Sequence, residues 1–198
     1  MDNTAPLNFE EACVLTQVTN RPSRERSSVK HGDQCRINKG REQLQHDPVE
    51  IDLICLYVNE FLEALRMDQC ANPRVELPSF HCDEDLSSYI KEAIYSPICA
   101  KGGDCKDMVW MKFTKDGYLG VVAMSNDINF NMPEPGQTAN TSGIIIRELG
   151  KEWDKSFVLV FPLINFPEGM ERGSIETGIG NFLIDKGVPI LDFYSHRY

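Results

Sequence analysis

Residues 108–198 alternate between strand-like and helix-like segments, and this order leaves few architectures open to the chain. Residues 108–114 and 118–124 are rich in β-forming side chains, and they flank Lys115-Asp116-Gly117, which is typical of a hairpin turn. Residues 157–161 are a continuous apolar run, as expected of a strand that is buried on both faces. We therefore expect a sheet that begins at residue 108.

Helical segments separate the expected strands. Apolar side chains at helical spacing predict one helix over 142–155 and another over 174–186, which ends at Gly187. Residues 188–194 form the last expected strand. Because a strand–helix–strand order implies a right-handed crossover, 157–161 and 188–194 are predicted to pair in parallel. The predicted fold class is α/β, or α+β, with a mixed sheet, a C-terminal parallel βαβ unit and a helical N-terminal part.

Two further helices are predicted before the sheet. Asp47-Pro48-Val49-Glu50 has the residues of a helix start, with Asp as the N-cap, Pro in the first turn and Glu three residues after the cap. Apolar residues then recur at helical spacing and predict a helix over 48–68. The second helix is expected over 84–95, with Asp83 as its cap and Pro97 after its end.

The first 46 residues differ from the rest of the chain in charge. Residues 20–46 hold seven basic and three acidic side chains, so this stretch carries +4 and the remainder carries −14 of the net −10. Large apolar residues are few here, which disfavours the burial of a face. We expect a flexible, solvated segment over 1–46 and a single α/β domain over 47–198. The alternative for the basic stretch is a binding arm for an acidic partner.

The overall charge excludes some classes of partner. The chain has 30 acidic and 20 basic residues, which gives a formal charge of −10. A surplus of carboxylates disfavours nucleic-acid binding, because phosphate contacts need Lys and Arg. No apolar run approaches the length of a bilayer span, so no membrane partner is expected. The N-terminal Met1-Asp2-Asn3-Thr4 lacks the basic and apolar regions of an export signal, and we expect a cytoplasmic protein.

The seven cysteines are an odd number with irregular spacing, so they are predicted to be reduced thiols. Five potential zinc ligands nevertheless fall within one stretch: Cys70, His81, Cys82, Cys99 and Cys105. They lack the paired spacing of zinc modules, so no metal and no other cofactor is predicted. A metal-bound or disulfide-closed loop between Cys99 and Cys105 is the alternative.

The polar residues that follow the expected strands are candidates for a binding site. In open α/β sheets, ligands bind beyond the carboxyl ends of the strands and beside helix N-termini. That edge would collect Asn165, Glu176 in the first turn of the next helix, and His196 after the last strand. Asp127 joins them if 118–124 runs in the same direction. A structural interpretation is also open, because a carboxylate near a helix N-terminus interacts favourably with the helix dipole.

Two glycines fall in the first turns of the helix whose expected cap is Ser174. Each glycine costs about 1 kcal/mol relative to alanine inside a helix, so Gly178 and Gly180 need a compensating contact. Close packing is one such reason and contact with a ligand is the other. The candidate substrate-binding residues are therefore Asn165, Ser174, Gly178, Asn181 and His196.

The same region resembles a known enzyme family. The apolar strand 157–161, the sequence Glu171-Arg172-Gly173-Ser174-Ile175-Glu176-Thr177-Gly178 and the following Lys186-Gly187-Val188-Pro189-Ile190 are similar to segments of nucleoside 2-deoxyribosyltransferase relatives. The resemblance implies that Glu176 is the nucleophile that attacks the anomeric carbon of the sugar. Cleavage of an N-glycosidic bond also needs an acid that protonates the leaving base, and Asp127 is the candidate for that role.

Three functional hypotheses follow. The first is a protein that binds a nucleoside-like or nucleotide-like small molecule, or cleaves its N-glycosidic bond. The second is a non-catalytic acidic interaction protein, such as an immunity protein or an inhibitor of a basic partner, because charge of one sign steers association with a partner of the other sign. The third is a small regulator with a basic arm. An enzyme should place Glu176 in a pocket, whereas an inhibitor should present acidic residues on an open face.

Overall fold

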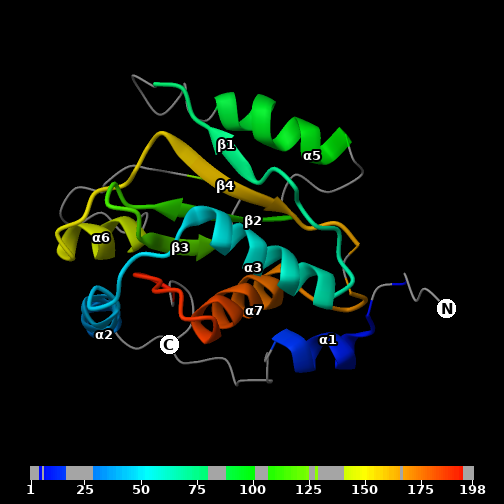
Figure 1. The fold of residues 1–198 in the computed structure, drawn as a ribbon, viewed down its shortest axis with the longest axis horizontal. Coiled ribbons are helices and arrows are strands. Elements are labelled where there is room, and N and C mark those ends of the chain that lie inside the picture. Colours follow the sequence, from blue (N-terminus) through cyan, green and yellow to red (C-terminus); the bar gives the residue numbers. More distant parts are fainter. Residues whose placement is uncertain are drawn as a thin grey trace.

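A computed structural model of the chain describes residue 5 and residues 7–16, 29–79, 88–100, 107–124, 128, 141–165 and 167–193. Its centre is a four-stranded sheet in the order β1-β4-β2-β3 (Figure 1). The strands are β1 (Arg74–Glu76), β2 (Met108–Phe113), β3 (Leu119–Ala123) and β4 (Phe157–Pro162). Neighbouring strands are antiparallel throughout. The combination of helices with a sheet confirms the mixed α/β class.

The hairpin predicted between β2 and β3 is confirmed. Gly117 has a φ of 89°, which a glycine adopts without the steric penalty of a side chain. The Thr114 amide donates to the Tyr118 carbonyl oxygen at 2.9 Å and closes the turn. Trp110 then lies opposite Ala123, and Met111 lies opposite Val122.

The predicted parallel βαβ unit is wrong. The neighbours of β4 are β1 and β2, both antiparallel, so the β2–β3 hairpin occupies the position that a parallel partner would need. Within the expected strand 188–194, Ile190 forms a parallel bridge with Leu119 at the outer edge of β3. The amides of Leu191 and Asp192 donate to the carbonyls of Leu119 and Gly120. The chain therefore crosses from β4 to the opposite edge of the sheet.

Helices cover both faces of the sheet. On one face lie α3 (Ile51–Ala64) and α7 (Arg172–Asp185), whose apolar residues pack on Val109, Met111 and the same side of β4, and α1 (Phe9–Thr16) packs on α7 (Figure 1). On the other face lie the π-helix η1 (Ile90–Tyr95), α5 (Ser96–Ala100) and α6 (Thr141–Glu148), which pack on Met108 and Trp110. Residues of β2 pack alternately on the two faces, because successive side chains of a strand point to opposite sides of the sheet.

The boundaries of α3 and of the η1–α5 segment differ from those predicted. The N-cap of α3 is Glu50 rather than Asp47, and the helix spans Ile51–Ala64 within the predicted 48–68. The first part of the helix expected over 84–95 lies outside the described residues. Pro97 does not end that helix, because the chain stays helical through α5. Pro97 comes two residues after the end of the π-helix η1, and prolines and π-turns are usual sites of irregularity within a helix.

The boundaries of α6 and α7 differ as well. The helix expected over 142–155 stops at Glu148, because Gly150 has a left-handed φ of 69° and the Lys151 amide turns back to the Ile146 carbonyl oxygen. The N-cap of α7 is Glu171 rather than Ser174. Its predicted end at Gly187 is confirmed, with a φ of 83°.

The N-terminal segment contains a helix that packs on the sheet domain. Helix α2 (Val29–Gln43) lies within the predicted flexible segment 1–46, beside α6. Arg36 and Ile37 are buried, and Gly40 is in close contact with Leu149 and the Leu191 carbonyl. This part of the segment differs from the solvated linker that its composition predicts. The division into 1–46 and 47–198 stays a prediction. Among the described helices, none has the length and apolar character of a membrane span.

Candidate functional site

The structure places the predicted catalytic and binding residues in different surroundings. Asp127 and His196 lie outside the described residues. Glu176 is five residues after the N-cap of α7, beyond its first turn, and is 8% exposed. Asn165 is exposed and donates its side-chain amide to Asp68 at 2.6 Å. Because the sheet is antiparallel, the carboxyl-edge rule no longer gives a reason for these residues to converge, and their role stays a prediction.

The remaining candidates lie along α7. Ser174 and Asn181 are half-buried, and Gly178 is buried. A Cβ on Gly180 would lie 1.6 Å from Cε2 of Phe193. Such an overlap is impossible without displacement of the ring, so close packing against Phe193 explains why residue 180 is a glycine.

A buried ion pair attaches α2 to the chain segment that borders β3. Arg36 donates from Nε to Oδ1 of Asp192 at 2.9 Å and from Nη2 to Oδ2 at 2.6 Å. The two side chains are 6% and 0% exposed. Beside the pair, between α2 and residues 190–193, lies a cavity of about 20 Å³. That volume holds about one water molecule and excludes a nucleoside.

A second buried cation lies on the face of the sheet that α6 and η1 cover. The Nζ atom of Lys112 lies 4.4 Å from the ring centre of Trp153 and 5.2 Å from that of Trp110. Lys112 is 1% exposed, so its ammonium group is stabilised between aromatic rings and closed to a dissolved ligand. Sequence patterns did not single out this residue, because its partner Trp153 lies in a different segment of the chain.

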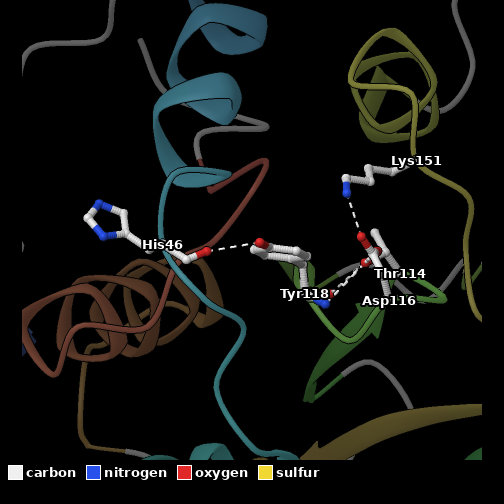
Figure 2. Close-up of polar contacts among 5 residues, drawn as sticks. All are labelled: His46, Thr114, Asp116, Tyr118 and Lys151. Atoms are coloured by element: carbon white, nitrogen blue, oxygen red, sulfur yellow. Dashed lines mark hydrogen bonds and ion pairs between the residues drawn. The ribbon is translucent and has the colours of Figure 1, made fainter.

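The β2–β3 turn is joined to two other segments by polar contacts (Figure 2). The Tyr118 hydroxyl donates to the His46 carbonyl oxygen at 2.9 Å. Thr114 donates to Asp116, which also accepts from Lys151. Partial burial opposes ionisation of Asp116, but the hydrogen bonds from Lys151 and Thr114 lower its pKa below the ordinary value. These contacts hold the turn in place.

The cysteines that the structure describes are not all reduced thiols. Cys99 is disulfide-bonded. The prediction of reduced thiols is therefore wrong for Cys99, and its sulfur is no zinc ligand. Cys35, Cys55 and Cys70 are free. Among the described side chains, no group of three or more potential ligands could hold a metal ion. Three further potential ligands lie outside the described residues: His81, Cys82 and Cys105.

We expect Cys55 to resist alkylation. Burial, followed by the nearby Asp52 and Cys70, raises the pKa of the Cys55 thiol to about 11. At about pH 8 its thiolate fraction, which is the reactive form, is about 100-fold lower than that of an ordinary cysteine. Iodoacetamide labelling with site-resolved mass spectrometry should modify the exposed Cys35 long before Cys55. Equal labelling rates at the two thiols would contradict the half-buried position of Cys55 and its raised pKa.

The outer side of α3 is an open acidic surface. Residues 47–68 contain six acidic side chains and one basic side chain, so this segment alone carries −5. Helical spacing places the buried Ile54, Val58, Phe61 and Leu62 on one side. We call the opposite side the acidic face of α3. Its members are Asp52, Leu53, Leu56, Glu60 and Glu63.

Leu56 lies at the centre of the acidic face of α3. It is 53% exposed, and Leu53 one turn before it is 38% exposed. Asp52 and Glu60 lie one turn before and after Leu56, and Glu63 lies two turns after it. Lys186, which directly follows α7, forms an ion pair with Glu60 at 2.7 Å. The face therefore combines exposed apolar groups with surrounding carboxylates.

Comparisons of the chain with protein-family models, with curated proteins and with solved structures give no match.

Proposed function

We propose that the protein is a non-catalytic acidic interaction protein that binds a basic surface of a protein partner, as an immunity protein or an inhibitor does. The observation that carries this proposal is the acidic face of α3, where exposed leucines lie among carboxylates. A surface of one charge sign raises the association rate with an oppositely charged partner and excludes partners of like charge. The net charge of −10 acts in the same direction.

The surroundings of the predicted catalytic residues also support a binding role. Asn165 is hydrogen-bonded to Asp68 at the surface, whereas Glu176 lies in the interior.

A nucleoside-binding or N-glycosidase function is the second candidate, and one observation favours it. Glu176 is a carboxylate with 8% exposure on a helix of the apolar core, where an acidic group is unusual. Buried carboxylates are frequent in active sites. In this candidate Glu176 is the nucleophile and Asp127 the acid.

Selection from a random peptide library displayed on phage tests the first proposal. We expect the immobilised protein to enrich peptides rich in Lys and Arg. Raising the ionic strength to about 1 M, where the Debye length is about 3 Å, should elute them. Enrichment of neutral or acidic peptides would contradict the proposal.

Calorimetric titration with purine and pyrimidine nucleosides tests the second candidate. We expect no binding heat for the wild type. Binding or turnover that is lost in Glu176→Gln, a nearly isosteric variant, would instead establish the nucleoside function.

A further inference from the structure

We propose that the acidic face of α3 is the docking surface for an amphipathic basic helix of the partner protein. The partner helix lays apolar side chains on Leu53 and Leu56 and places Lys or Arg side chains against Asp52 and Glu63. This inference rests on the proposed function and names its binding surface and the class of partner segment.

The first step is the exposure of the two leucines. The inward side of α3 already buries four apolar residues in the core, and Leu53 and Leu56 are not among them. Single exposed leucines are common on protein surfaces. Two leucines one turn apart on the outer side of one helix form an adjacent apolar pair, on which apolar side chains of a partner can pack.

The second step is the charge around this apolar pair. Glu60 is already bound to Lys186, which also lies over the Tyr57 ring at 4.9 Å. In the part of the chain that the structure describes, Asp52 and Glu63 have no ion-pair partner. Glu60 and Glu63 lie one turn apart, and like charges at this spacing destabilise a helix slightly. A cationic partner would relieve this repulsion, whereas a second copy of this chain would double it.

The third step is the spacing of the two carboxylates along α3, which favours a helix as the occupant. Asp52 and Glu63 are eleven residues apart in sequence, which is three turns or about 16 Å along a straight helix. A partner helix packed along α3 presents cations with the same period and places its apolar ridge between them. The two leucines, one turn apart, match apolar residues at the same interval on the partner.

Fluorescence anisotropy with a defined probe tests this inference. The probe is a labelled synthetic peptide that repeats Leu-Lys-Lys-Leu-Leu-Lys-Leu, which forms an amphipathic helix. One control peptide has the same composition in a scrambled order, and another has Glu in place of Lys. We expect the lysine helix to bind, the scrambled peptide to bind at least about tenfold more weakly, and the glutamate helix not to bind.

Variants locate the binding surface. Leu56→Ser and Glu63→Lys should each raise the Kd of the lysine helix about tenfold or more. Glu92→Lys makes the same charge change at an exposed position of η1 on the other face of the sheet, and Val14→Ser removes an exposed apolar residue outside α3. These two controls should change the Kd by about twofold or less. Far-UV circular dichroism verifies that each variant is folded.

The possible results separate the inference from the proposed function. Equal effects of Glu63→Lys and Glu92→Lys would show that general charge attracts the peptide, which overturns the docking surface and leaves the proposed function standing. Equal binding of the scrambled peptide would overturn the helical occupant. If the wild type were a dimer and Leu56→Ser a monomer, the surface would serve self-association, and the partner helix would be overturned as its occupant. Failure of the lysine helix and of every library peptide to bind would overturn the proposed function itself.

Discussion

Asp192→Ala is expected to lower the free energy of unfolding by about 3–5 kcal/mol, the usual loss when one partner of a buried ion pair is removed. The Asp192 side chain is fully buried and accepts two hydrogen bonds from Arg36 at 2.9 and 2.6 Å. Alanine would leave the Arg36 guanidinium, whose side chain is 6% exposed, without this carboxylate. Urea denaturation, with the slope checked for two-state behaviour, measures the loss.

The double variant Arg36→Met/Asp192→Leu is the control for this prediction. It replaces both charges with apolar groups of similar size, and such replacements are often neutral or stabilising. We expect it to recover most of the stability lost in Asp192→Ala. A loss of less than about 1 kcal/mol in Asp192→Ala would contradict the buried pairing of α2 with residue 192.

Gly120→Ala is expected to destabilise the protein by about 3 kcal/mol, at the upper end of the range for overpacked cores. A Cβ on Gly120 would lie 2.2 Å from Cζ3 of Trp153 and 3.2 Å from the Lys112 carbonyl oxygen. Trp153 is 1% exposed, so its ring has no room to move away. The melting temperature and urea midpoint of the variant measure the effect.

A double-mutant cycle with Trp153→Phe tests the cause of that loss. Phenylalanine lacks the outer ring atoms that the new Cβ would meet, and it removes the Trp153 Nε1–H group, which is buried without a hydrogen-bond partner among the residues that the structure describes. We expect Gly120→Ala to be at least about 1 kcal/mol less destabilising in the Trp153→Phe background. Strict additivity would show that the contact with Trp153 is not the cause.

Local patterns predicted the elements that depend on neighbouring residues. The apolar spacing around Ile54, Val58 and Phe61 identified α3, and Asp116-Gly117 identified the β2–β3 hairpin. Both signals arise within a few residues, where periodicity and turn geometry are encoded directly. The end of α7 at Gly187 was predictable for the same reason.

The pairing of strands was not predictable in this way. The apolar run of β4 indicates burial on both faces but carries no information about its neighbours. One neighbour, β1, has three residues, too few for a period to appear. The packing of α2 was equally hidden, because it depends on Arg36 and on an acidic partner 156 positions away in the sequence.

The sequence predicts that the protein has an acidic surface, but it does not predict where on the fold that surface lies. The surplus of carboxylates is visible in the composition, which by itself favours an acidic interaction protein as one hypothesis. The arrangement of Leu56 among Asp52 and Glu63 follows from helical spacing once the boundaries of α3 are known. Its exposure depends on the tertiary packing, which leaves this side of α3 uncovered.

An NMR titration of the isotope-labelled protein with the leucine–lysine helix tests the central claim most directly. Amide shifts report which residues contact the peptide without any assumption about the site. The proposed function and its docking surface predict that the largest shifts fall on residues 52–63, with much smaller shifts over residues 174–181 of α7. Largest shifts around Ser174 and Glu176, or shifts spread evenly over the surface, would contradict the acidic face of α3 as the binding surface.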